Sequence, residues 1–572
     1  MLITDRFINK FYDVIKKKNV VIMTSVDTDS LCSVMILTQL LKFDDVPFTV
    51  RAVEGWESVK ACFEDFQDQQ VSLVMINCGG TKALSRFTLP EQSKVFVIDS
   101  HRPFNIENVF DPDQIYILVD SQELEDLRLP QYEEVMDENS DEESADDESD
   151  DEEHVSYEQR MEKIQRKAIK REEKRLWERR KQNLLWTYYE STWMAAPTSV
   201  RLLEIIGEAG KMTAESLWFA SIGLNSSYVD NLISVNMYTN ICLDRLRLFV
   251  HRYAPKNIVN QGRVDDMLHI TFEQDLPLAL YSQWDLENAM RVDEFFAIET
   301  KNWTQKGDSN MKQLLSNMGI LLNETKQKFG ALATERRNEC IKILEEKIDS
   351  KFGTFFCHMG YAARLSAFDV ARAATIRLEV PKSKPAMNRF MDAQRLLKST
   401  TIGGRENRQM LNHTFETSCQ RALLVIWKTV AAAINQSEVI SNGPLYLYSC
   451  SRPIDEDMVQ SRHFLYVTTS FMLKAFASMR RGRETKPLIA MFPLNHERSG
   501  WLVVTGVMPL GTSYDDNLLK TCIGRAFERV KKMSQRLRIE DDSFNSDIIY
   551  LKSEDRTSFL GCLEAIFETA NQ

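Results

Sequence analysis

The first 120 residues alternate short apolar runs with amphipathic stretches, and this alternation limits the possible folds more than any other feature. Amphipathic helical patterns, such as Leu31–Leu41 and Trp56–Phe66, lie between most of the apolar runs. Alternation of this kind predicts an α/β domain with a mostly parallel sheet covered by helices. The predicted strands are Val20–Met23, Pro47–Val53, Val71–Asn77, Lys94–Ile98 and Ile115–Val119.

Polar clusters follow three of these predicted strands, at positions 25–30, 77–80 and 99–103. Because the carboxyl ends of parallel strands meet at one edge of a sheet, we expect the clusters to converge on one crevice. Carboxylates such as Asp27 and Asp29 could hold Mg²⁺ or Mn²⁺ there. Alternatively, they are ordinary loop and N-cap residues of the following helix. Three converging clusters favour the site over the cap.

The length of 572 residues is too great for one hydrophobic core and suggests three or four domains. No apolar run approaches the roughly 20 residues that a membrane span needs. The N-terminus lacks the apolar core of a signal peptide and indicates an amphipathic helix with Phe7, Phe11, Val14 and Ile15 on one side. Ten scattered cysteines without a CxxC indicate reduced thiols in the cytosol or nucleus, and no zinc site.

The net charge of −12 is concentrated in one acidic block. Residues 133–153 hold 14 acids and no base, so the remainder is near neutral, and its charge neither demands nor excludes nucleic acid. The sequence 137–153 cannot bury enough apolar surface to fold, and we expect a disordered loop. Acids follow three serines, which are candidate phosphorylation sites unless the block is an inert spacer: Ser140, Ser144 and Ser149.

A basic segment, Tyr157–Trp186, follows the acidic block and lacks Gly and Pro, which predicts a long helix. Its cations could contact nucleic acid or form a nuclear-import signal. A plain solvated helix face is the alternative. The candidate residues are Lys174, Arg175, Arg179, Arg180 and Lys181.

The rest of the chain divides into a helical part and a second α/β part. Helical patterns continue through Thr198–Asp230 and dominate residues 231–437, most clearly over Leu314–Lys351, with a strand-like interruption at Leu268–Phe272. Such a block usually supplies interaction surface rather than chemistry. For the end of the chain we predict two helices, Leu518–Gln535 and Arg556–Thr569, and strands at Leu445–Ser449, Phe464–Thr468, Leu488–Phe492, Trp501–Val507 and Asp547–Leu551. The expected units are 1–136, 137–156, 157–230, 231–437 and 438–572.

The three polar clusters resemble the motifs of the DHH phosphoesterase superfamily, which includes the RecJ exonuclease. That superfamily has an Asp-x-Asp after the first strand, an Asp-containing turn, the Asp-His-His that names it and a later Asp. The resemblance implies two Mn²⁺ or Mg²⁺ ions that activate water against a phosphoester. The positions that match are Asp27, Asp29, Asp99 and His101.

Other ligand positions depart from the superfamily pattern. Asn77 stands where the second motif has Asp, Ser100 replaces the first His of the third motif, and no carboxylate lies at Asn225–Ser226, where the later Asp belongs. Two dications need anionic ligands to compensate their charge. We therefore expect a catalytically inactive relative with no metal cofactor. A single ion at the three aspartates, or a metal-free crevice in which Arg102 partners an aspartate, stays open.

A closer resemblance, to the cell division control protein 45 family, covers most of the chain. It rests on the order of moderately specific segments with the acidic block between them. These segments are 25–33 (SVDTDSLCS), 55–56, 76–79, 99–103, 177–180, 217–224, 318–319, 326–329, 358–361, 524–527 and 554–556. The resemblance implies a DHH-like domain, a helical inter-domain region and a C-terminal domain related to the DHHA1 module.

The same resemblance implies a nuclear, non-catalytic scaffold of DNA replication. Family members join the MCM hexamer and the GINS tetramer to form the CMG helicase at origins and forks, with the help of replication-initiation loading factors. This chain has no GxxxxGK[ST] for ATP hydrolysis. Its C-terminal part lacks the glycine-rich GGGH turn of active relatives. A basic loop in this part could still contact the backbone of single-stranded DNA through Arg480, Arg481, Arg483 and Lys486. Arg102 of the first domain is a further candidate for DNA contact. The rival functions are an active Mn²⁺-dependent exonuclease and a free-standing single-strand-binding module.

Overall fold

The structure is a computed structural model. It describes the chain apart from residues 91–92, 137–156, 254–268, 318, 320, 322, 348–353, 361–363, 403, 481–484, 496–497, 510–517, 543 and 571–572. The predicted disordered loop with Ser140, Ser144 and Ser149, and the basic residues Arg481 and Arg483, therefore lie outside the described residues.

The N-terminal domain is built on a six-stranded parallel sheet with the order β1-β7-β5-β4-β2-β3. This confirms the predicted α/β class and all five predicted strands. The sequence pattern missed β1, because two residues are too short to show a period. The strands are β1 (Leu2–Ile3), β2 (Asn19–Thr24), β3 (Phe48–Ala52), β4 (Val71–Ile76), β5 (Lys94–Ile98) and β7 (Ile115–Leu118).

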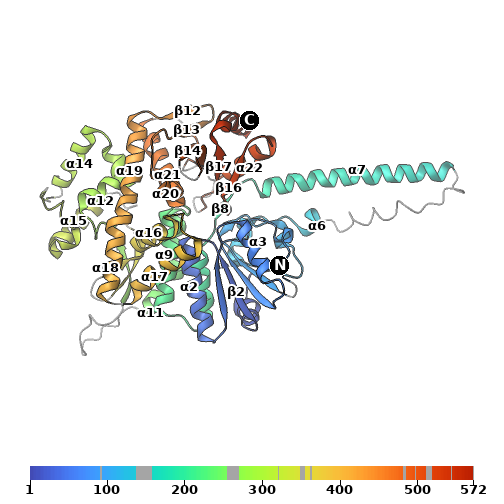
Figure 1. The fold of residues 1–572 in the computed structure, drawn as a ribbon, viewed down its shortest axis with the longest axis horizontal. Coiled ribbons are helices and arrows are strands. Elements are labelled where there is room, and N and C mark those ends of the chain that lie inside the picture. The colour runs from blue at the N-terminus through green and yellow to red at the C-terminus, as the bar shows by residue number, and fades with distance from the viewer. Residues whose placement is uncertain are drawn as a thin grey trace.

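Helices cover both faces of this sheet (Figure 1). Side chains alternate along β4, so Val74 and Ile76 pack in one apolar cluster and Leu73 and Met75 in another. The first cluster holds the helices α2 (Thr28–Phe43), α8 (Thr198–Glu208) and α9 (Ala214–Val229), and the second holds α3 (Trp56–Asp65). At the N-terminus, the helical turns Ile8–Tyr12 and Asp13–Ile15 bury Phe7, Phe11 and Ile15, as predicted.

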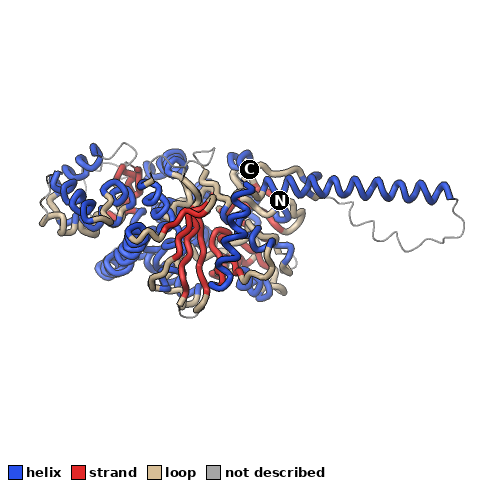
Figure 2. Tube along the Cα trace, turned by 90° about the horizontal axis from the view of Figure 1, so that it is seen from above, coloured by secondary structure: helices blue, strands red, loops and turns tan. Residues whose placement is uncertain are grey.

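The predicted basic helix is present as α7 (Tyr157–Tyr188), which projects away from the body of the molecule (Figures 1 and 2). At 1.5 Å per residue, its 32 residues span about 48 Å. Only its C-terminal end packs against the body, where Leu185 and Tyr188 join Ile106 and Val135 in a small apolar cluster. The chain then forms β8 (Trp193–Met194), which pairs with β6 (His101–Arg102).

The middle region is mainly helical, as predicted, with a small sheet of order β11-β10-β9. The helical pattern expected most clearly over Leu314–Lys351 is interrupted, because α14 ends at Asn317 and α15 begins at Thr334. Gly319, with φ of +71°, lies between them in a conformation that ends helices. The helices are α10 (Val235–Ile241), α11 (Arg247–Tyr253), α12 (Leu286–Val292), α13 (Glu294–Thr300), α14 (Gln305–Asn317), α15 (Thr334–Lys347), α16 (Ala367–Glu379), α17 (Ala386–Thr401), α18 (Arg405–His413) and α19 (Gln420–Asn435), and the strands are β9 (His269–Asp275), β10 (Thr354–Gly360) and β11 (Arg364–Ser366).

The C-terminal domain has a mostly antiparallel six-stranded sheet of order β12-β13-β14-β15-β17-β16. The strand predicted at Phe464–Thr468 was wrong, because these residues lie within α21 (Arg462–Met479), where Ser461 caps the helix by accepting from the Phe464 amide. The other predicted strands are confirmed. The elements are β12 (Val439–Asn442), β13 (Leu445–Ser449), β14 (Leu488–Leu494), β15 (Trp501–Val507), α22 (Ile523–Met533), β16 (Ile539–Asp542), β17 (Asn545–Lys552) and α23 (Arg556–Ala570).

Candidate functional site

The three polar clusters do converge at the carboxyl edge of the parallel sheet. Asp27 is the N-cap of α2, where its Oδ1 accepts a hydrogen bond of 2.8 Å from the Ser30 amide. Its Oδ2 accepts from the hydroxyls of Ser25 and Ser30. The cap interpretation is therefore confirmed for Asp27, and all of these donors come from its own loop and helix.

Asp29 is buried and links α2 to the start of α8. It accepts hydrogen bonds from the Thr198 amide (2.9 Å), the Ser199 amide (3.0 Å) and the Ser199 hydroxyl (2.6 Å). Asn77 Nδ2 donates a fourth, at 2.9 Å. Burial and the nearby Asp27 carboxylate raise the pKa of Asp29, and the hydrogen bonds from Ser199 and Asn77 oppose that rise only in part.

Asn77 has φ of +51°, a left-handed conformation that Asn tolerates better than most residues. Its Oδ1 accepts from the Thr198 hydroxyl (2.6 Å) and the Ser100 amide (3.0 Å), and its Nδ2 also donates to Ser30 Oγ (3.0 Å). A carboxylate at this position could not donate to Asp29. The amide is therefore suited to this network in a way that the Asp of the DHH pattern is not.

Asp99 lies beneath the glycine turn that follows β4. Its Oδ2 accepts from the amides of Gly79 (3.2 Å) and Gly80 (2.7 Å), and its Oδ1 contacts His101 Nδ1 at 2.7 Å. Burial alone would raise the pKa of Asp99, but the His101 charge and these hydrogen bonds outweigh it and hold the pKa at about 2. Burial likewise opposes charging of His101, yet Asp99 raises the pKa of the imidazole.

Arg102, a predicted DNA contact, is buried instead. Its Nη1 donates to the carbonyl of Asp99 (2.6 Å), and its Nη2 donates to Glu123 Oε2 (2.7 Å). The guanidinium carbon lies 4.0 Å from the centre of the Phe104 ring. The terminal nitrogens of Arg102 are thus engaged within the domain, and its acidic partner is Glu123 rather than one of the site aspartates.

These residues do not fit a dinuclear metal centre. Protein donors already occupy carboxylate oxygens of Asp27, Asp29 and Asp99. At the position of the later Asp, Asn225 donates to the Ser221 carbonyl and accepts from the Tyr238 hydroxyl. Within the part of the chain that the structure describes, no three His, Cys, Asp or Glu side chains gather closely enough to hold a metal ion.

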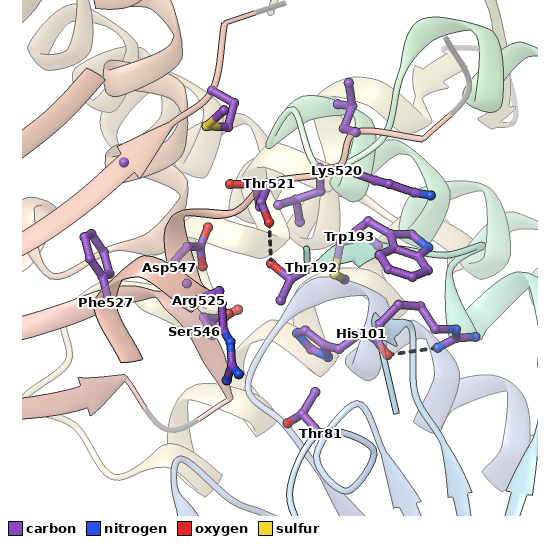
Figure 3. Close-up of a pocket in the computed structure, with 18 of the residues that line it drawn as sticks. Thr81, His101, Thr192, Trp193, Lys520, Thr521, Arg525, Phe527, Ser546 and Asp547 are labelled. Carbon is purple, nitrogen blue, oxygen red and sulfur yellow. Dashed lines mark hydrogen bonds between the residues drawn. The ribbon is translucent and has the colours of Figure 1, made fainter. Parts of the chain in front are cut away.

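A cavity of about 1500 Å³ lies beside this edge of the sheet, between the N-terminal and C-terminal domains (Figure 3). His101 and Trp193 line it from one side, and Arg525 and Asp547 from the other. Reciprocal backbone hydrogen bonds of 2.8 Å between Thr192 and Thr521 connect the two domains at its edge.

Several cations that line this cavity were not predicted from the sequence. Four of them have acidic partners. Lys474 pairs with Glu294 (2.6 Å) and Lys531 with Asp541 (2.7 Å). Arg525 and Lys532 both pair with Glu528. Lys520 lies 4.9 Å from the Trp193 ring centre. The amphipathic pattern of 523–533 is the signal that could have revealed a basic face here. The cations are Lys82, Arg86, Lys474, Lys520, Arg525, Lys531 and Lys532.

The predicted basic residues lie in two separate regions. Lys174, Arg175, Arg179 and Arg180 are exposed along α7, whereas Lys181 is half-buried, lies over the Trp177 ring and lines the cavity. In the C-terminal domain, the Arg480 guanidinium lies over the Phe476 ring at 4.5 Å, and Lys486 donates to the Gly443 carbonyl at 2.6 Å. Each group therefore has its own local contacts, on α7 and in the C-terminal domain.

Comparisons with known proteins identify the family. The CDC45 family model matches residues 20–165 and 133–565, which together include nearly the whole chain. The chain belongs to the CDC45 family. The human cell division control protein 45 homolog is 30% identical over 98% of this chain and 99% of its own length, and the mouse homolog is 28% identical over 99% and 100%. Membership of the CDC45 family makes the chain a DNA replication factor and confirms the resemblance seen in the sequence.

The crystal structure of CDC45 from Entamoeba histolytica has the same fold. It matches with a TM-score of 0.68 at 17% sequence identity, over 99% of this chain and 100% of the Entamoeba chain.

All ten cysteines are described, and none of them forms a disulfide. Among the described helices of this CDC45 family member, none is long and apolar enough to cross a membrane.

Proposed function

We propose that the chain is a non-catalytic scaffold subunit that joins the MCM hexamer and the GINS tetramer into the CMG helicase. It would act in the nucleus, at origins and forks, and would be recruited with replication-initiation loading factors. The observation that carries this proposal is similarity to the human CDC45 homolog along 98% of the chain. Full-length similarity matters because a scaffold needs all of its domains to hold its partners in place.

The state of the crevice supports a non-catalytic role. A two-metal phosphoesterase needs carboxylate oxygens that face the ions and water. Here Asp29 accepts four hydrogen bonds from the protein and is 5% exposed. A metal ion at Asp29 would have to displace Thr198 and Ser199, which begin α8. The aspartates of the crevice therefore serve the fold, and no cofactor is part of the proposal.

The helical middle region supports a role in binding partner proteins. Large apolar side chains are exposed at several positions of this region, among them Leu321 (66%), Ile402 (56%) and Phe295 (41%). Exposed apolar groups on a large, helical surface suit protein interfaces.

The exposed cations of α7, including Arg179 and Arg180, suit either nucleic acid or an import receptor. Ser140, Ser144 and Ser149, which precede this helix in the sequence, remain predicted phosphorylation sites.

Besides the protein partners, we propose that the chain binds single-stranded DNA with moderate or weak affinity. The cavity beside the crevice carries both cations and aromatic rings, a combination that suits single strands. Its acidic lining residues, such as Asp230 and Asp547, keep the local charge mixed. We therefore expect DNA to add to the partner contacts rather than replace them, in contrast to a free-standing single-strand-binding module.

The deciding experiment is purification of the tagged chain from nuclear extract, followed by quantification of MCM and GINS subunits. Co-purification of both at near-equal ratios supports the scaffold, and their absence refutes it. The rival function, a Mn²⁺-dependent exonuclease, retains Asp27, Asp29, Asp99 and His101 in its favour. Single-strand cleavage by the pure chain with Mn²⁺, lost in Asp27→Ala and Asp99→Ala, would establish the rival. Elemental analysis of the same preparation reports any bound metal.

A further inference from the structure

The end of α7 lies against helix α22 of the C-terminal domain, and a tryptophan joins them. The guanidinium carbon of Arg529 lies 3.6 Å from the centre of the Trp186 ring, and that of Arg525 lies 5.4 Å from it. Despite these contacts, 46% of the Trp186 side chain is exposed. A large, flat aromatic surface is thus held in place by arginine and still open to solvent.

Positive charge surrounds this ring. Arg525, Arg529 and Lys532 are spaced i, i+4 and i+7 along α22, which places them on one face of the helix. Glu528 pairs with both Arg525 and Lys532, the latter at 2.7 Å. Arg529 forms no ion pair within the described part of the chain. Glu190, just after α7, also acts on Arg529 electrostatically. Two acids therefore face three cations, and a net positive surface remains at the ring.

Residues next to Trp186 attach the base of α7 to the N-terminal domain, whereas Trp186 itself contacts α22 of the C-terminal domain. Leu185 and Tyr188 pack in the small apolar cluster at the base of the helix. The Tyr188 hydroxyl donates to the Phe104 carbonyl at 3.0 Å, and the Ile106 amide donates to the Tyr189 hydroxyl at 2.9 Å. The exposed part of the Trp186 ring, and the lack of an ion pair at Arg529 within the described residues, are therefore not explained by anchoring of α7 to the N-terminal domain.

The junction is continuous with the cavity between the domains. Lys181 and Leu185 of α7, together with Arg525, Lys531 and Lys532 of α22, line one wall of that cavity. Trp186 and Arg529 do not line the cavity themselves, but each adjoins a residue that does: Trp186 follows Leu185, and Arg529 lies one helical turn after Arg525.

We infer that the α7–α22 junction binds single-stranded nucleic acid, with one base stacked on Trp186 and the flanking phosphates on Arg525, Arg529 and Lys532. Stacking on an exposed aromatic ring requires an unpaired base, which a duplex does not offer. An acidic peptide would satisfy the cations and leave the ring unused. The inference rests on the proposed single-stranded DNA binding and assigns a place to it.

Fluorescence anisotropy of the full chain with labelled dT₂₀ tests the inference. Trp186→Leu is expected to weaken binding by at least about fivefold, because a stacked base is lost. Arg529→Glu is expected to weaken it further and to lower the slope of log K against log salt by about 0.7, one phosphate contact. Trp501→Leu is the matched control, since Lys552 lies 4.7 Å from that ring in the C-terminal domain, and its affinity should not change. Circular dichroism checks that each variant is folded.

The outcomes separate this inference from the proposed function. If the wild-type chain does not bind dT₂₀, the proposed DNA binding fails, and the inference falls with it. If the wild type binds and folded Trp186→Leu and Arg529→Glu bind equally well, only the inference fails. If these variants keep DNA affinity and lose MCM or GINS on purification, the junction is a protein interface and the inference is overturned.

Discussion

Asn77 Nδ2 donates a hydrogen bond of 2.9 Å to Asp29 Oδ2 where the active members of the resembled superfamily would place a second carboxylate. The amide turns what would be a repulsive pair into a bonded one without any ion. Through Asp29, the same network reaches the amides of Thr198 and Ser199, so β4, α2 and α8 are joined at one buried point. The crevice therefore has a structural role in fixing these three elements relative to one another.

The variant Asn77→Asp is expected to lower the free energy of unfolding by about 3 kcal/mol, because it places two carboxylates within hydrogen-bonding distance in a buried site. Urea denaturation at pH 7.5 measures the loss. Asn412→Asp, at an exposed position of α18, is the control and should change stability by less than about 0.5 kcal/mol. Recovery of the lost stability on addition of Mn²⁺ would show that the crevice can still accept an ion, against our account.

Gly223 of α9 provides a second test of the same hydrogen-bond network around Asp29. A Cβ at Gly223 would lie 2.2 Å from Ser199 Oγ and 2.9 Å from Asp29 Oδ1. Gly223→Ala is therefore expected to destabilise the protein by about 2 kcal/mol or more, as overpacking does. Gly561→Ala in α23 is the matched control, because nothing lies within 4 Å of its Cβ. The control should gain about 0.5–1 kcal/mol from the helix propensity of Ala. Equal effects of both variants on the melting temperature would contradict the close packing of Gly223 against this network.

Much of the N-terminal domain could be predicted because buried parallel strands appear as apolar runs in the sequence. The crevice was located for the same reason, since polar residues follow the runs. Its internal bonds could not be predicted: the Thr198 hydroxyl reaches Asn77 across 121 residues of chain. The charge of Arg102 indicated a DNA contact, but charge alone says nothing about burial. At Phe464–Thr468, β-branched residues suggested a strand that the packing of α21 overrides.

The pair of Asp99 and His101 should make stability depend on pH. Asp99 raises the pKa of His101 above 6.5. The contribution of charged His101 to the free energy of unfolding is therefore complete below pH 6.5 and is lost as the pH rises through the raised pKa. We expect the stability difference between the wild type and His101→Gln to shrink between pH 6 and pH 9. Asp99 has its pKa lowered to about 2, so its contribution of about 2 kcal/mol persists above pH 4 and is lost towards pH 2. Urea titrations at one-unit pH steps measure both effects, and a constant difference from pH 5 to pH 9 would contradict the His101 part.

The variant Arg102→Ala distinguishes a structural role of the buried Arg102 side chain from a direct contact with DNA. It leaves Glu123 without its partner at 2.7 Å and removes donors from the Asp99 and His101 carbonyls, so we expect a loss of about 3 kcal/mol in the free energy of unfolding. Because the guanidinium is only 4% exposed, the affinity of the folded fraction for dT₂₀ should not change. The control is Arg395→Ala, whose side chain is 71% exposed beside Asp392 and should cost less than about 0.5 kcal/mol. A variant that keeps its stability and loses DNA affinity would return Arg102 to the role expected from the sequence.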